Sequence, residues 1–193
     1  MSDRIEIFGF APSTFVRTAR MACIEKGVAH DLKPLEFRKA SHEALHPYLK
    51  IPAMRFKETV LFETIAITVF VDEAFDGPAL QPDDAAGCAR MHQWASALAA
   101  YAFGDLVAAF LGDNGDNAVA STKIAAHFAI LDNGLEARSF LAGNNLSIAD
   151  LFLAPMLAFA EARLGGHIAR DFRRLSDWRD RMWARESFRG TAP

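Results

Sequence analysis

The sequence predicts an α+β protein in which a small mixed domain precedes an all-helical domain. Strand-like runs and helical patterns alternate over about the first eighty residues, in the order βαβ followed by ββα. Beyond Pro82 no convincing strand pattern occurs, and alanine-rich helical segments alternate with breaks at glycine, asparagine and aspartate. We therefore expect one domain over residues 1–76 and a second over residues 84–193, with residues 76–83 as the candidate linker.

The first domain begins with a short β-rich run over residues 5–9, which ends at a turn signal before Pro12. Apolar residues then recur at helical spacing from Ser13 until Gly27 ends the helix. A second strand fits residues 30–37, because a βα unit leads naturally to a parallel strand. The remaining predicted elements are one or two helical turns at 41–45, strands at 51–56 and 59–61, and a helix at 64–75.

The second domain is predicted to be helical throughout. Its helices are expected at about 84–111, 117–141, 147–163 and 170–186. The intervening breaks, at residues 112–115, 143–145 and 165–166, combine glycine with asparagine or aspartate, or are glycine alone.

Composition and charge limit the classes of partner. The chain of 193 residues is 51% hydrophobic and 23% charged, which is ordinary for a globular protein, and its net charge of −3 gives no reason to expect nucleic acid or an anionic membrane. No apolar run approaches the roughly 20 residues of a membrane helix. The N-terminus lacks the pattern of a signal peptide, and Cys23 and Cys88 both fall in predicted helices. We therefore expect a soluble cytoplasmic protein with two buried thiols and no disulfide.

Four short motifs follow one another along the chain. Residues 13–17 read Ser-Thr-Phe-Val-Arg, and residues 50–53 read Lys-Ile-Pro-Ala. Residues 62–67 read Phe-Glu-Thr-Ile-Ala-Ile, and residues 147–150 read Ser-Ile-Ala-Asp. In this order and spacing the motifs resemble the cytosolic glutathione S-transferase family, in particular its serine-type classes, phi first and theta and zeta more loosely. The resemblance implies a thioredoxin-like glutathione-binding domain followed by an all-helical domain.

The resemblance also implies that Ser13 activates the thiol of glutathione. That thiol must become a thiolate before it can attack an electrophile. A hydroxyl at a helix N-terminus can donate a hydrogen bond to the thiolate, and the helix end adds a favourable potential. A plain N-cap serine is the alternative that the sequence alone favours.

Four further residues are implied to hold the other parts of glutathione. In the family the bond before the proline is cis, which here implies a cis Ile51-Pro52 bond and a backbone at Ile51 that pairs with the cysteinyl residue of glutathione. Glu63 and Thr64 stand at a predicted strand-to-helix junction. Free N–H groups and a hydroxyl there can hold the γ-glutamyl carboxylate, while Glu63 meets the ammonium group. A simple capping pair is the alternative for these two residues.

The chain departs from the family pattern where relatives bind the glycyl carboxylate. Phi and theta relatives carry His-Lys at this place, whereas this chain has Phe37-Arg38. Arg38 and Lys50 can replace that charge. Leu49 stands where relatives often have glycine, and Tyr48 falls where some classes carry an aromatic anchor for a partner subunit.

The sequence disfavours two other chemistries. Residues 42–46 read His-Glu-Ala-Leu-His, the spacing of a zinc protease, but Pro47 disfavours helical geometry at His46 and no third ligand is evident. We expect no metal. Cysteine-type chemistry needs a thiol at the position of Ser13, and Cys23 lies more than two helical turns further on.

Two functions therefore stay open. The first is an enzyme that joins glutathione to a small hydrophobic electrophile, or uses it in peroxide reduction, dehalogenation or isomerisation. The second is a transferase-like protein that binds a ligand or partner without turnover. A homodimer is expected for either, and the electrophile pocket is expected from Pro12 and the helix around residues 94–110. Ser147 and Asp150 are expected to form a reciprocal helix cap.

Overall fold

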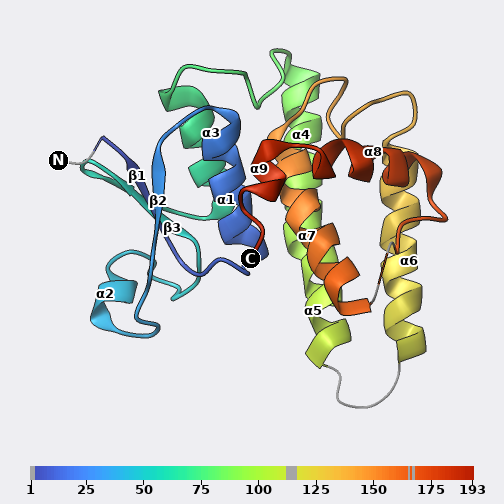
Figure 1. Cartoon of the computed structure of the whole chain (residues 1–193), viewed down its shortest axis with the longest axis horizontal. Helices are drawn as coiled ribbons and strands as arrows, with labels where there is room; N and C mark the ends of the chain where they lie inside the picture. The colour runs from blue at the N-terminus through green and yellow to red at the C-terminus, as the bar shows by residue number, and fades with distance from the viewer. Residues whose placement is uncertain (1–2, 112–116, 165, 167) are drawn as a thin grey trace. The chain divides into compact units, whose positions relative to one another are not determined.

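Figure 1 shows the computed structural model of the chain, which describes residues 3–111, 117–164, 166 and 168–193. Contacts divide the chain into two compact units. The first comprises Met1–Gln81 together with Arg185–Pro193, and the second comprises Pro82–Ala184. The sequence predicts residues 185–193 as part of the helical domain, whereas their contacts group them with the first unit.

The first unit contains a mixed sheet. Its described strands are β1 (Ile5–Phe8), β2 (His30–Lys33), β3 (Ala53–Phe56) and β4 (Thr59–Phe62). They lie in the order β2-β1-β3-β4, with β1 and β2 parallel and the other neighbours antiparallel. The register aligns Ile7 of β1 with Leu32 of β2 and Met54 of β3, so apolar side chains meet at the centre of the sheet.

Helices of the first unit follow the predicted order. The predicted ones are α1 (Thr14–Glu25), α2 (Ala40–Glu43) and α3 (Thr64–Ala74), and the unit also contains α9 (Glu186–Arg189), which the sequence did not predict. Helices α1 and α3 pack against each other beside the sheet (Figure 1). Val16 of α1, Ile67 of α3 and Ile7 of β1 are fully buried and belong to the core. The predicted βαβ–ββα arrangement is confirmed.

Two strands are shorter than the sequence predicts, and proline explains both. β2 ends at Lys33 rather than residue 37 because Pro34 has no backbone N–H to continue the ladder. β3 begins at Ala53 rather than residue 51, directly after Pro52, for the same reason. The loops on either side of α2 are correspondingly longer than expected.

The described elements of the second unit are helices. They are α4 (Ala85–Ala97), a π-helical turn (Leu98–Ala102), α5 (Phe103–Leu111), α6 (Asn117–Gly134), α7 (Ile148–Leu164) and α8 (Arg173–Trp183). The first predicted helix therefore contains a π-helical turn, which apolar spacing alone does not reveal. The predicted break at residues 112–115 lies outside the described residues. Within the described ranges, no helix combines the length and the apolar character that crossing a bilayer requires.

Helix α6 ends at Gly134, seven residues before the predicted end at 141. The chain beyond it turns repeatedly, and Ala137 has a positive φ of 58°. The backbone N–H of Leu141 donates to the carboxylate of Asp150 at 2.9 Å, so it is not available for a helical bond. Gly134 ends the helix, and further on the side chain of Asp150 takes a backbone donor that the sequence pattern assigns to the helix.

Asp150 lies at the start of α7 and is fully buried. Its carboxylate accepts hydrogen bonds from the backbone N–H of Ser147 at 2.9 Å and from the Ser147 hydroxyl at 2.7 Å. It also accepts from the backbone of Leu141 and from the indole N–H of Trp178 at 2.8 Å. One half of the predicted reciprocal cap is confirmed, because Asp150 accepts from the N–H of Ser147. The other half is wrong, because the Ser147 hydroxyl donates to Asp150 and does not accept from a described N–H of the helix.

The C-terminal segment attaches to α1 through Arg185. α8 ends at Trp183, and Arg185 adopts an extended ψ of 143° before the short helix α9 begins. The Arg185 guanidinium donates two hydrogen bonds of 2.7 Å to the carboxylate of Glu25 at the end of α1. The predicted single helix over 170–186 is therefore wrong at its C-terminal end, because the chain leaves the helix to reach this partner.

Candidate functional site

Ser13 is the N-cap of α1, five residues after β1 ends at Phe8, and Gly9 begins the turn between them. Its backbone is extended (φ −65°, ψ 125°), and its Oγ accepts from the backbone N–H of Val16 at 3.4 Å. The hydroxyl oxygen is the acceptor in that contact, so the hydroxyl proton is left to donate to another group. The side chain is half-buried. Ser13 thus combines the plain N-cap with the geometry of a hydrogen-bond donor at a helix N-terminus.

Gly9 allows the loop before Ser13 to approach α1 closely. A Cβ atom at this position would lie 2.5 Å from Cγ2 of Val16, which is too close for a side chain. The glycine therefore fixes how the turn enters the helix.

A buried cation lies one helical turn beyond Ser13. Arg17 is 5% exposed, and its guanidinium donates to the backbone carbonyl of Phe188 at 3.3 Å and lies 4.9 Å from the centre of the Phe188 ring. Burial lowers the pKa of Arg17, and the positive charge of Arg20 lowers it further. The motif placed Arg17 on α1, but nothing in the sequence indicated that Phe188, 171 residues away, would cover it.

The peptide bond between Ile51 and Pro52 is cis, as the family resemblance implied. Ile51 is half-buried and lies two residues before Ala53, the first paired residue of β3. The backbone of Ile51 therefore stands at the end of a strand, where an extended peptide could pair with it.

Glu63 and Thr64 lie where β4 passes into α3. Glu63 is the N-cap residue with a positive φ of 68°, its side chain makes no capping hydrogen bond, and it is exposed. Thr64 is buried. The side-chain cap considered as the alternative does not form, and the N–H groups in the first turn of α3 are not capped by Glu63. Such a helix end is suited to an anionic group.

Arg38 and Lys50 are both exposed cations of the loops around α2. Arg38 has a positive φ of 61°. Among the described residues, neither side chain forms a hydrogen bond or an ion pair. The imidazole of His42 connects the two backbones, because its Nδ1 accepts from the N–H of Arg38 at 3.2 Å and its Nε2 lies 2.9 Å from the carbonyl oxygen of Lys50.

The histidines of the sequence His-Glu-Ala-Leu-His do not share a helix. α2 ends at Glu43, so His46 lies beyond it, as Pro47 predicts. His42 and His46 are both buried, and the Nδ1 of His46 has no hydrogen-bond partner among the residues that the structure describes. Burial lowers the pKa of His46, partly opposed by the charge of Glu63. In the part of the chain that is described, no cluster of three or more potential metal ligands occurs.

The thiol chemistry available to the chain itself is limited. Cys23 is buried in α1, and burial raises its pKa to about 12. This thiol is therefore protonated at neutral pH and is a poor nucleophile. Cys88 is half-buried, and its thiol donates to the backbone carbonyl of Pro82.

Tyr48 is the more exposed of the chain's two tyrosines, at 72% of its surface. Its ring lies 6.2 Å from that of Phe62 and 6.4 Å from that of His46, so the ring is held at its base while most of it faces solvent. A large aromatic side chain that is mostly exposed in this way is suited to a contact with another protein chain.

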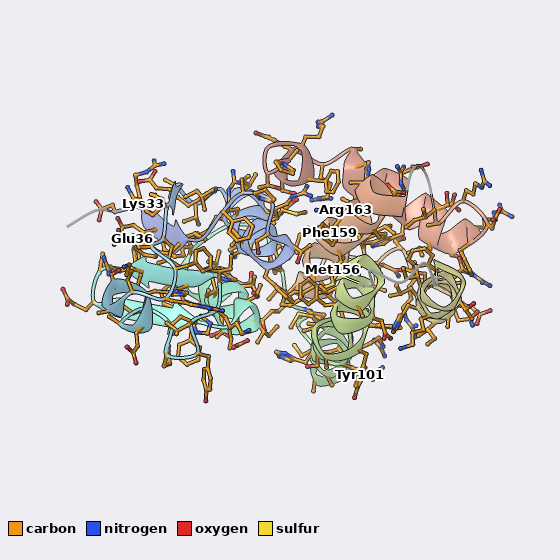
Figure 2. The ribbon with its side chains drawn as sticks, turned by 90° about the horizontal axis from the view of Figure 1, so that it is seen from below. Lys33, Glu36, Tyr101, Met156, Phe159 and Arg163 are labelled. Carbon is orange, nitrogen blue, oxygen red and sulfur yellow. The ribbon has the colours of Figure 1, made fainter. Side chains whose placement is uncertain are left out.

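An apolar pocket of about 30 Å³ lies within the second unit. Its walls come from the π-helical turn and from α5, α6 and α7, and Met156 of α7 is one of its lining residues (Figure 2). Among its described lining residues, the one polar ring belongs to His127, whose Nε2 lies 3.0 Å from a carboxylate oxygen of Asp105. The volume is far below the roughly 300 Å³ at which ligand pockets begin, so we interpret this pocket as a packing gap.

Comparison with known proteins gives the same family for both halves of the chain. The family model described as the N-terminal domain of glutathione S-transferase matches residues 12–74, and the one for the C-terminal domain matches residues 93–181. Glutathione S-transferase F9 of Arabidopsis thaliana is 25% identical over 91% of this chain and 90% of its own length. Glutathione S-transferase 4 of Zea mays is 28% identical over 76% of this chain and 73% of its own length.

Solved structures show the same fold. The crystal structure of a glutathione S-transferase from Methylobacillus flagellatus with GSH bound superposes with a TM-score of 0.84 and 22% identity. The match covers 98% of this chain and 99% of that one. Since models of both domains match in order and full-length relatives share the fold, this chain belongs to the glutathione S-transferase family.

Proposed function

We propose that the protein is a glutathione transferase in which Ser13 activates the thiol of glutathione for attack on a small hydrophobic electrophile. The observation that carries this proposal is the position of Ser13 at the N-terminus of α1, with its oxygen bonded to Val16 and its proton left to donate. The curated relatives, named as glutathione S-transferases, support the same activity.

Glutathione would be bound as a co-substrate along the first unit. We infer that the backbone of Ile51, set by the cis bond to Pro52, pairs with the cysteinyl residue. The uncapped N-terminus of α3 at Thr64 would bind the γ-glutamyl carboxylate, and the exposed carboxylate of Glu63 would meet the ammonium group.

The chemistry follows from the pKa of the thiol. A free thiol has a pKa of about 8.5 and is mostly protonated at neutral pH. A hydrogen bond from the Ser13 hydroxyl stabilises the thiolate, and the thiol proton passes to solvent. The thiolate sulfur then forms a bond to the electrophilic carbon; in a substitution the bond to the leaving group breaks and that group departs with its electron pair, and in an addition the π bond opens and takes up a proton from solvent. Lowering the pKa by one unit corresponds to about 1.4 kcal/mol of thiolate stabilisation.

A screen of chemically diverse electrophiles with glutathione, together with binding calorimetry, tests the proposal. We expect glutathione to bind and at least one class of electrophile to be conjugated. Binding without any turnover would instead support the second function, a transferase-like binding protein. Leu49 leaves room for that alternative, because it departs from the glycine that relatives often have at this place. Its backbone holds a positive φ of 53°, which glycine adopts more readily.

We also propose a homodimer in which Tyr48 contacts the partner subunit. The Tyr48→Ala variant should dissociate to monomers at micromolar concentration, because a large exposed aromatic is a typical interface anchor. Light scattering measures this directly. Tyr101→Ala is the matched control, since Tyr101 is similarly exposed at 68%. A monomeric parent would contradict the dimer, and a dimer that survives Tyr48→Ala would contradict only the anchor.

The cytoplasm is the location we propose. Both cysteines are free, and Cys23 is enclosed in the core of the first unit. Free thiols of this kind suit a reducing compartment.

A further inference from the structure

His42 is fully buried, and both of its ring nitrogens are engaged. Its Nδ1 accepts a hydrogen bond from the backbone N–H of Arg38, which can only donate. The proton of the neutral ring must therefore sit on Nε2, where it donates to the carbonyl oxygen of Lys50 at 2.9 Å. The two contacts together select one tautomer, and no polar atom of the ring is left for any other role.

These two contacts join segments that the sequence separates by twelve residues. Arg38 follows β2, and Lys50 directly precedes Ile51 and its cis bond to Pro52. The side chains of Arg38 and Lys50 are exposed and, among the described residues, form no ion pair or hydrogen bond. His42 thus fixes the backbones that carry two cations while leaving both charges available to an anion.

The same ring also packs towards the loop that carries Ser13. The ring of Phe37 meets His42 edge-on at 5.3 Å between centres. Phe37 in turn lies 6.0 Å from Phe10, which is in the turn between β1 and Ser13. Aromatic contacts therefore run from the Lys50 loop, through His42, to the start of α1.

We propose that His42 is a positioning residue that holds Arg38 and Lys50 together as the binding site for the glycyl carboxylate of glutathione. This inference rests on the proposed function, because it assigns a part of the same glutathione site. His42 does not touch the ligand. It acts by joining the backbones of Arg38 and Lys50, from which both exposed side chains can reach one carboxylate.

The experiment compares glutathione with its monoethyl ester at the glycyl carboxylate, which removes that negative charge. Calorimetry on the parent protein should show about 10-fold weaker binding of the ester, the scale expected for losing hydrogen bonds to a charged group. In His42→Phe, which keeps the ring volume and loses both hydrogen bonds, glutathione should bind as weakly as the ester. Affinity for the ester should stay within about twofold of the parent, because the rest of the site is intact.

His92→Phe is the matched control, since His92 is exposed on α4 in the second unit. This variant should keep the parent's preference for glutathione over the monoethyl ester. If His42→Phe does not fold, His42→Gln provides the second test, because its amide retains one of the two hydrogen bonds and should reduce the preference several-fold. Activity measurements on the His42 variants should show a raised KM for glutathione, with kcat at saturating glutathione nearly unchanged.

A folded His42→Phe protein that retains the full preference for glutathione over the ester overturns the inference, and so does a parent without any preference. A different outcome would contradict the proposed transferase function without contradicting the role of His42. If the parent prefers glutathione and loses that preference in His42→Phe, yet conjugates no electrophile, His42 is a positioning residue of a binding protein and the transferase activity is wrong.

Discussion

Asp150→Ala is expected to destabilise the protein by about 4 kcal/mol or more. A helix cap alone is worth about 1 kcal/mol. Asp150, however, is fully buried and accepts four hydrogen bonds, from the N–H and hydroxyl of Ser147, the N–H of Leu141 and the indole of Trp178. Removing the carboxylate leaves these donors buried without an acceptor, at about 1–3 kcal/mol each, and only part of that cost is relieved by relaxation.

Urea denaturation of the parent and the variant measures this difference in the free energy of unfolding. Asp84→Ala is the matched control, because Asp84 is also an aspartate that caps a helix, accepting from the N–H of Gly87 at 2.8 Å, but is exposed. It should cost about 1 kcal/mol. If the two variants are destabilised equally, the buried network adds nothing to an ordinary cap and our account of Asp150 is wrong.

Much of the first unit could be predicted because its signals are local. The turn after β1, the Ser13 cap and the glycine after α1 lie next to the elements they delimit. The hairpin of β3 and β4 is likewise defined by a two-residue turn between short apolar runs. Elements of this kind depend on neighbouring residues, so a single sequence contains the information.

The errors occur where distant residues decide the structure. α6 ends at Gly134, and beyond it Asp150 accepts the N–H of Leu141; α8 ends at Trp183, and beyond it Arg185 turns towards Glu25. The partners are 9 and 160 residues apart. Gly134, where α6 ends, is a local stop signal that helical periodicity alone does not weigh, whereas no residue near the end of α8 indicates that Arg185 will bind Glu25.

The candidate site was accessible from the sequence only through motifs. Ser13, Ile51 and Glu63 stand at a helix start, before a strand and at a strand-to-helix junction, which are the positions that the family resemblance implied. Their roles towards glutathione stay predictions. His42 could not be assigned this role from the sequence, because its local pattern matches only the zinc-protease spacing, whereas its contacts to Arg38 and Lys50 depend on the folded loop.

Ser13→Ala is expected to lower turnover with a simple electrophile by about 10-fold or more. The physical reason is that each unit of thiol pKa corresponds to about 1.4 kcal/mol of thiolate stabilisation, and the hydroxyl donor supplies part of it. Binding of glutathione should change much less, because Ile51, Glu63 and Thr64 are proposed to hold the rest of the tripeptide. The midpoint of the pH–rate profile should move upward, since more alkaline solution is then needed to form the thiolate.

Loss of the N-cap is a separate effect of this substitution and needs its own control. Ser13 caps α1 at Val16, and an alanine there costs about 1 kcal/mol of stability, whereas glycine costs only a few tenths. Ser13→Gly removes the hydroxyl with little harm to the helix. We expect it to lose as much turnover as Ser13→Ala, while its thermal stability stays close to that of the parent.

The most direct test is the pKa of the thiol of bound glutathione, followed by the ultraviolet absorbance of the thiolate across a pH titration. In the parent we expect this pKa to lie at least about one unit below the 8.5 of a free thiol. In Ser13→Gly, at saturating glutathione, it should return towards that value, because the hydroxyl donor is gone. An identical, lowered pKa in both proteins would contradict the assignment of Ser13 and transfer the activation to another group, such as the hydroxyl of Thr14 or a backbone amide.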